Sequence, residues 1–400
     1  MSGLIAHRAA WIIVTPQTIL RNGHIKTAGD KIIEVGRGRI SDCQNVIDYG
    51  PGALMPGLVN VHTHLELGAL KDKLPYSQGF QTWVQTLIRL RAALSQEELR
   101  NGIEKGVTEL LQSGCVAAGE ISSLGISRNA FLDSSLKGVW FYEFLGEDTT
   151  NIPILKSNGN GSISVAGHAP HTTSPILLKK LKKMAAQNGV PFSIHLAESE
   201  DEIEFLQTGQ GAWADFLTSR GIDFSDWGMP VSTPFHYIEQ LGLSDSDTIL
   251  VHVLRETAPA FHRIAETGAY VCLCPRSNRN LHNRLPNVNK MRQAGVNLCL
   301  GTDSLASVSS LSIFDEMAFL THAFPSIPAP DILEMATCNG AKALGIDKHF
   351  GSLKPGKANR MLYASMNVSN KKALMEIIVN KGFDTLKIIM KGENVKNRNK

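Results

Sequence analysis

The sequence lacks most of the features that mark membrane, secreted or nucleic-acid-binding proteins. Charged residues make up 19% of its 400 residues, aromatic residues 6%, and the formal net charge is only +3. So small a charge on so long a chain gives no basic surface for nucleic acid or for a membrane. No apolar run approaches the roughly 20 residues of a membrane span, and no signal-peptide pattern is present. We therefore expect a globular protein whose partner is a small-molecule substrate.

Cysteine is also sparse, and its spacing excludes common metal-finger and redox motifs. None of the six cysteines forms a C-x-x-C pair, and four of them lie in apolar runs, where free thiols are often buried. Reduced core cysteines are typical of a reducing compartment, so the sequence predicts a cytoplasmic protein.

The two ends of the chain share a pattern of short strands. Asn22-Gly23 is predicted to form a tight turn between two of them, and residues 371–380 are predicted to form a helix. The strands are predicted from short β-branched or apolar runs at 11–14, 18–20, 31–35, 361–364 and 386–390.

The middle of the chain alternates apolar strand-like runs with helical stretches. Helix starts are marked by the capping box Ser95-x-x-Glu98 and by Ser174 before a proline. The first strand-like run begins at Val59, and the others are 115–120, 138–145, 162–168, 191–195, 248–252, 269–274 and 296–303. Eight strands with intervening helices predict an α/β fold, the (β/α)₈ TIM barrel.

Polar residues recur where these strands end. His62 and His64 end the first strand, and because strand side chains alternate, both point the same way. Two such histidines can begin a metal site, although two ordinary surface histidines would explain the pair alone equally well. Later strands of the series end in His168, His195, His252 and Asp303. The carboxyl ends of barrel strands form the active site, so we predict that these residues meet there.

Imidazole nitrogens with one carboxylate suit a divalent metal, zinc first and iron as the alternative. A catalytic metal lowers the pKa of a bound water, which then needs a group to accept its proton. Glu198 lies three residues after His195 and is predicted to act as general base and then as general acid. The alternative is a helix-start carboxylate that interacts with the helix dipole.

Several motifs in a fixed order resemble the amidohydrolase superfamily. They are Pro56-Gly57 before His62-x-His64, His195-x-x-Glu198, His252, Gly301-Thr302-Asp303 and the turn-rich segment 351–357. The resemblance covers nearly the whole chain and is greatest to the cytosine/adenosine-deaminase-like branch, which includes S-adenosylhomocysteine and methylthioadenosine deaminases. The His-Thr-His-Leu-Glu variant, with Cys274-Pro275-Arg276-Ser277-Asn278, resembles the aminodeoxyfutalosine deaminase subgroup.

The resemblance implies a fold, a reaction and a single-metal site. Residues 56–354 would form the barrel, and residues 1–55 and 355–400 would join in one small β-sandwich domain; a homodimer is the family-based expectation. The metal would be held by His62, His64, His195 and Asp303, with Glu198, His252 and Asp303 as the catalytic residues. The binuclear members carry a lysine on the fourth strand, and this strand ends in Gly167-His168 instead. The reaction would be hydrolytic loss of ammonia from a purine-like ring.

The substrate contacts rest on the same resemblance. Trp83 stands where the family has a substrate-side tryptophan, although the usual Pro-x-Glu does not follow. An arginine fork matches a carboxylate, so Arg276 is a candidate for an acidic substituent. The full set of predicted substrate residues is Glu66, Trp83, His168, Arg276, Asn278 and Ser304.

Two alternatives remain open on the sequence. The same site could hydrolyse another cyclic C–N or C–Cl bond, as in an imidazolone, a triazine or guanine. A non-catalytic barrel scaffold is the alternative from another class, but such a protein should have lost its metal ligands, and all are present.

Overall fold

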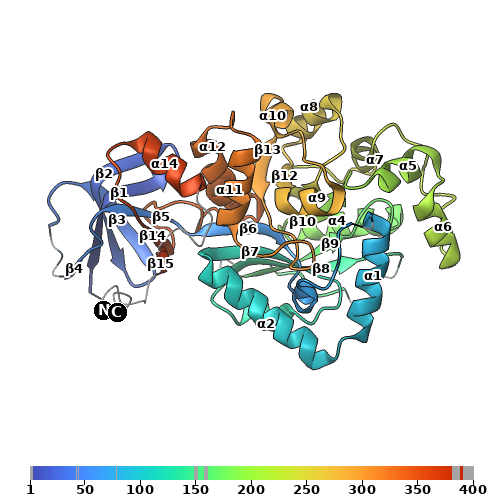
Figure 1. Cartoon of the computed structure of the whole chain (residues 1–400), viewed down its shortest axis with the longest axis horizontal. Helices are drawn as coiled ribbons and strands as arrows, with labels where there is room; N and C mark the ends of the chain where they lie inside the picture. Colours follow the sequence, from blue (N-terminus) through green and yellow to red (C-terminus); the bar gives the residue numbers. More distant parts are fainter. Residues whose placement is uncertain are drawn as a thin grey trace.

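Eight parallel strands form a nearly closed barrel at the centre of the molecule (Figure 1). The computed structural model describes residues 3–41, 43, 45–77, 79–147, 152–156, 161–380 and 388–390. The barrel strands, adjacent in chain order, are β6 (Leu58–Thr63), β7 (Cys115–Ser122), β8 (Lys137–Phe144), β9 (Ser162–Gly167), β10 (Phe192–Leu196), β11 (Thr248–His252), β12 (Tyr270–Leu273) and β13 (Asn297–Leu300). All eight predicted strands are confirmed, and so is the TIM-barrel fold.

The first and last strands meet through the segment that follows β13. Asn60 Nδ2 donates a hydrogen bond to Thr302 Oγ1 at 2.8 Å, and the backbone N–H of Thr302 donates to His62 O at 3.1 Å. Every residue of β6 is buried, as is every residue of β7, β9, β10 and β11. Helices cover the outer face of the barrel strands, and the inner face packs against side chains of the other strands, so these strands read as continuous apolar runs in the sequence.

Helices surround the barrel. Ser95 caps α2 in the predicted capping box, because its Oγ accepts from Glu98 N–H while the Glu98 carboxylate accepts from Ser95 N–H. None of the helices in the described ranges has the length and apolar character that crossing a bilayer would require. The helices are α1 (Phe80–Ala93), α2 (Gln96–Gln112), α3 (Arg128–Leu132), α4 (Pro175–Gln187), α5 (Glu200–Thr208), α6 (Ala212–Ser219), α7 (Pro234–Gln240), α8 (Ala258–Thr267), α9 (Pro275–His282), α10 (Val288–Gln293), α11 (Ile313–Ala323), α12 (Ala329–Glu334), α13 (Gly340–Ala343) and α14 (Lys371–Asn380), with a 3₁₀ helix η1 (Leu65–Leu70) and a π-helical turn η2 (Met335–Asn339).

Both chain ends contribute to a second, separate sheet. Its strands are β1 (Ile5–Thr15), β2 (Thr18–Ala28), β3 (Lys31–Arg37), β4 (Asn45–Asp48), β5 (Gly52–Pro56), β14 (Met361–Ser365) and β15 (Ile388–Met390). β14 pairs antiparallel with β5 and with β15, which joins the C-terminal strands to the N-terminal ones. The predicted helix 371–380 is confirmed as α14, while residues 386 and 387 of the last predicted strand lie outside the described residues. The predicted domain boundaries stay a prediction.

The central strand of this sheet, β1, is buried on both faces. Ile12 and Val14 pack in a small core within the sheet domain, whereas Trp11 and Ile13 join the large core shared with the barrel helices. Alternating side chains therefore attach the sheet to the barrel through one face.

The predicted turn at Asn22-Gly23 is wrong. Both residues lie inside β2, where Gly23 pairs with Ala9 of β1. A Cβ atom on Gly23 would approach Ile12 Cγ1 to 2.7 Å, and Asn22 adopts a positive φ of 49°. The pair serves a close approach of two strands, a use of Asn-Gly that the sequence alone does not distinguish from a hairpin turn.

Candidate active site

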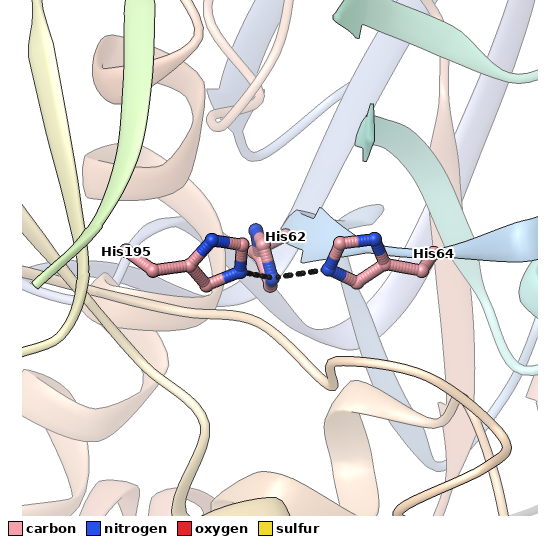
Figure 2. Close-up of side chains that lie close together, drawn as sticks. All are labelled: His62, His64 and His195. Carbon is pink, nitrogen blue, oxygen red and sulfur yellow. Dashed lines mark hydrogen bonds between the residues drawn. The ribbon is translucent and has the colours of Figure 1, made fainter. Parts of the chain in front are cut away.

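Three histidines converge at the carboxyl ends of β6 and β10. His62 Nε2 lies 3.1 Å from His64 Nε2 and 3.3 Å from His195 Nε2, as Figure 2 shows. Zinc–nitrogen bonds of about 2.0–2.1 Å at tetrahedral angles place two nitrogens about 3.3 Å apart, so the spacing fits a common cation. The His62 side chain is fully buried and that of His64 is 14% exposed, so solvent can reach the cluster.

The histidines present lone pairs rather than charges. His195 Nδ1–H donates to the backbone oxygen of His168 at 2.7 Å, which leaves the Nε2 lone pair directed at His62. Burial, and then the neighbouring His195 ring, lower the pKa of His64 to about 3. Burial and the surrounding rings also hold the pKa of His62 well below its usual value. Neutral imidazoles are the form that binds a metal.

Asp303 supplies the carboxylate. Its Oδ1 lies 3.8 Å from His64 Nε2, while its Oδ2 accepts hydrogen bonds from Ser277 Oγ at 2.6 Å and Ser307 Oγ at 3.1 Å. The serines fix one oxygen and leave the other facing the histidines, the outer-shell arrangement that orients metal ligands. The sequence prediction missed both serines, although Ser277 lies in the 274–278 segment that the resemblance singled out.

A second group of possible ligand atoms comes from Glu143, His168 and His195, and these atoms lie within 4.8 Å of one another. It shares His195 with the first group, and the Nδ1 of that ring is already bonded to a backbone oxygen. His168 Nδ1 in turn lies 2.6 Å from Thr172 Oγ1. Because His195 has one free nitrogen and it faces His62, the geometry favours one metal.

Glu198 lies beside this cluster between two further histidines. Its Oε1 accepts a hydrogen bond from His282 Nε2 at 3.1 Å and lies 3.6 Å from His252 Nε2. Asn278 Nδ2 donates to His252 Nδ1 at 3.0 Å, so the proton of the neutral His252 ring is on Nε2 and points toward Glu198. Burial alone would raise the pKa of Glu198, but His252 and His282 outweigh it and lower that pKa. The prediction missed His282, which is one helical turn after Asn278.

The backbone is strained at the strand ends that carry these residues. Positive φ angles occur at Ala197 (52°), His252 (71°), Val253 (47°) and Asp303 (62°). Such conformations cost of the order of 1–3 kcal/mol each and concentrate at functional sites. The strain therefore marks the same strand ends as the titratable side chains do.

Glu202 holds the strained turn before Glu198. Its two carboxyl oxygens accept from the backbone N–H groups of Ala197 and Glu198, each at 2.8 Å. Glu202 is fully buried, and burial raises its pKa to about 8. Glu202 thereby fixes the backbone from which the Glu198 side chain reaches the site.

We expect Glu202→Gln to misplace Glu198. An amide NH₂ cannot accept from a backbone N–H, so the unfolding free energy should fall by about 1–3 kcal/mol. A small shift of Glu198 should also lower kcat by about 10–100-fold. Thermal unfolding and steady-state rates measure both, with the exposed Glu204→Gln of the same helix as control. Unchanged kcat in Glu202→Gln would exclude the positioning role.

Three of the predicted substrate residues carry a buried polar atom that no described residue binds. The indole N–H of Trp83 and the hydroxyl of Ser304 are buried and have no hydrogen-bond partner among the described residues. Asn278 contacts His252 and keeps its Oδ1 unpaired within the same described part of the chain. Their roles toward the substrate, like that of His168, stay predictions.

Glu66 and Arg276 are instead engaged within the protein. Glu66 accepts from the N–H groups of Leu124 and Ile126, each at 2.9 Å, and from Ser122 Oγ at 2.5 Å. Arg276 Nε donates to Glu316 Oε1 at 2.8 Å, and its other nitrogens donate to the hydroxyl and carbonyl of Ser310. Both side chains are thus held by protein partners, and their predicted contacts with a substrate stay predictions.

Glu66→Ala tests this structural assignment. The variant should lose about 3 kcal/mol of unfolding free energy, because the buried Ser122 hydroxyl and the backbone N–H groups of Leu124 and Ile126 lose their acceptor. Denaturant unfolding measures the loss, with the exposed Glu104→Ala on α2 as control. Wild-type stability together with a raised KM would show that Glu66 contacts the substrate and does not stabilise the fold.

The placement of this cluster at the carboxyl ends of barrel strands is that of metal-dependent hydrolases. The chain belongs to the amidohydrolase family, whose model matches residues 53–393. It is therefore a hydrolase that acts on carbon–nitrogen bonds.

Named relatives cover most of the chain. The aminodeoxyfutalosine deaminase of a Nitratiruptor species is 30% identical over 373 residues, which are 86% of this chain and 87% of the relative. The 5-methylthioadenosine/S-adenosylhomocysteine deaminase of Desulfitobacterium hafniense is 29% identical over 383 residues, 89% and 83% of the two chains.

Solved structures share the fold. The Helicobacter pylori aminofutalosine deaminase in complex with methylthio-coformycin matches with a TM-score of 0.82 at 23% identity, covering 97% of this chain and 98% of that one. A Xanthomonas campestris adenosine deaminase with bound zinc matches with a TM-score of 0.78 at 21% identity, covering 96% and 91%.

Proposed function

We propose that this protein is a hydrolytic deaminase of adenine-type nucleoside derivatives. The observation that carries the proposal is the convergence of three Nε2 atoms on one point, with the free Asp303 oxygen and Glu198 beside it. The relatives named above support the adenine class, with aminodeoxyfutalosine as the finer candidate. We assign one divalent metal, zinc first, to His62, His64, His195 and Asp303.

The bound metal would lower the pKa of a water towards neutrality. Glu198 is ionised, so its carboxylate can accept a proton and then deliver it to a purine ring nitrogen as the ring loses its aromaticity. His252 directs its Nε2–H to the same region and can donate to the developing oxygen anion. The net change is replacement of an amino group by oxygen, with release of ammonia.

Two further expectations concern the cellular location and the oligomeric state. All six cysteines are free, and four are buried, which supports a reducing compartment and thus the predicted cytoplasmic location. A homodimer stays an expectation of the family resemblance.

A substrate panel tests the proposed function. The metal-loaded protein would be incubated with adenine, guanine and cytosine nucleosides, with an imidazolone and with a chlorotriazine, while ammonia and chloride are assayed. We expect ammonia from adenine nucleosides. Chloride release alone, or no ammonia from any purine or pyrimidine, would overturn the proposal in favour of the alternative hydrolase or the scaffold.

A further inference from the structure

Helix α9 holds three side chains against the active site. Ser277 and Asn278 donate hydrogen bonds to a candidate metal ligand and to a catalytic histidine, at 2.6 and 3.0 Å. His282 lies one helical turn after Asn278, and its Nε2 lies 3.1 Å from Glu198 Oε1. Residues four apart share one face of a helix, so α9 directs Asn278 and His282 to the same side. The first two contacts orient residues of the site, and the third has no role in the proposed reaction so far.

His282 is the donor of its hydrogen bond and is held in place by packing. A general base must be ionised before it acts, and an ionised carboxylate can only accept, so His282 Nε2 carries the hydrogen that Glu198 Oε1 receives. The imidazole packs against Phe80 of α1 with ring centroids 4.5 Å apart, and its side chain is only 3% exposed. The position of this donor is therefore fixed by the fold.

The two carboxylate oxygens of Glu198 have different surroundings. Oε1 accepts from His282 and lies 3.6 Å from His252 Nε2, whereas Oε2 has no hydrogen-bond partner among the residues that the structure describes. The side chain of Glu198 is 13% exposed, so a substrate can reach it. Asp303 shows the same division, because hydroxyl groups hold one of its oxygens and leave the other facing the histidines. In Glu198, one oxygen is thus held by the protein and the other is available to move a proton.

We propose that His282 is a positioning residue that holds Glu198 Oε1, so that Oε2 alone accepts the proton and returns it to the substrate. The inference rests on the proposed function and adds to it the atom that carries the proton and the residue that orients that atom. The oxygen that accepts the proton also releases it, so Glu198 ends each cycle ionised. Without the bond from His282 the carboxylate can rotate, and a displacement of about 1 Å in an active site can cost about 100-fold in rate.

Variants of His282 separate the hydrogen bond from the packing of the ring. His282→Phe keeps an aromatic ring against Phe80 but has no N–H, whereas His282→Gln loses the ring and keeps an N–H donor at nearly the same reach. His282→Leu removes both and serves as a second variant without a donor. Arg279→Gln changes an exposed residue of the same helix and is the control. Ammonia release from an adenine nucleoside gives kcat and KM, elemental analysis gives the metal content, and thermal unfolding reports the fold.

We expect His282→Phe and His282→Leu to lower kcat by about 10–100-fold and to change KM by less than about threefold, because the proton-carrying oxygen is misplaced while binding is kept. His282→Gln should recover most of this loss, and Arg279→Gln should match the wild type. The metal content should stay the same in all four variants, because His282 does not belong to the histidine and aspartate set.

A double-mutant cycle tests whether His282 acts through Glu198. In the Glu198→Gln background, adding His282→Phe should cost less than about a further threefold in kcat, because the carboxylate that His282 holds is already absent. Losses that multiply in full would show that His282 acts on the substrate directly and would overturn the inference.

Two other results would also overturn the inference while leaving the deaminase proposal intact. They are wild-type kcat in His282→Phe, and a larger loss of kcat in His282→Gln than in His282→Phe, which would make the packing of the ring the important contact. If the wild type deaminates no adenine nucleoside, the proposed function fails first and the role of His282 fails with it.

Discussion

Glu198→Gln is expected to bind the metal as the wild type does and to lose about 10²–10⁴-fold in kcat. The amide keeps the size of the side chain but cannot accept a proton from water or return one to the purine. Glu198 does not belong to the histidine and aspartate set, so the metal content should not change. Elemental analysis and steady-state ammonia release measure the two properties on one preparation.

A matched control lies two residues away. Glu200 carries a carboxylate on the same turn, but its side chain is 78% exposed and pairs with Arg255. Glu200→Gln should therefore keep wild-type kcat. Full activity in Glu198→Gln would show that another group moves the proton.

The second large effect concerns Asp303. Asp303→Ala should lose its metal during purification and fall by about 10³-fold or more in kcat/KM, because metal catalysis supplies several kcal/mol. Removing one of the two hydroxyls that orient Asp303, in Ser277→Ala, should weaken metal binding by about 10–100-fold and leave activity intact at saturating metal. Comparing the two variants distinguishes a residue that binds the metal from one that only orients a metal ligand.

Identical metal affinity in Asp303→Ala and the wild type would remove Asp303 from the metal site. A Ser277→Ala variant as damaged as Asp303→Ala would mean that the serine, and not only the carboxylate, takes part in the chemistry. Metal-buffered titrations resolve both cases.

The barrel could be predicted from the sequence because parallel strands buried on both faces leave long apolar runs. Each of these runs ends in a polar residue that differs from the apolar residues before it. His195, His252 and Asp303 can therefore be singled out from the sequence alone. The structure brings them together with His62 and His64, as the strand-end rule predicts.

The partners of the remaining polar residues could not be predicted in the same way. Glu66 follows the His62-x-His64 motif in sequence, yet its oxygens accept hydrogen bonds from the loop after β7, nearly 60 residues later. Arg276 has the chemistry of a carboxylate binder, yet Glu316 of α11 occupies it. Loop conformation decides the first pairing and helix packing the second, and both depend on tertiary structure rather than on local pattern.

His282 and Glu202 were missed for a related reason. Each lies one turn beyond a residue that the sequence singled out, namely Asn278 and Glu198. A polar residue four positions after a predicted site residue is therefore a signal that can be searched for in further sequences of this kind.

Titrating metal-depleted protein with zinc while measuring ammonia release from an adenine nucleoside tests the central claim most directly. The account predicts no release without metal and a linear rise that ends at one equivalent per chain, because His195 has one free nitrogen for the cluster. Activity that ends at two equivalents, or that does not depend on metal, would contradict a single-metal deaminase.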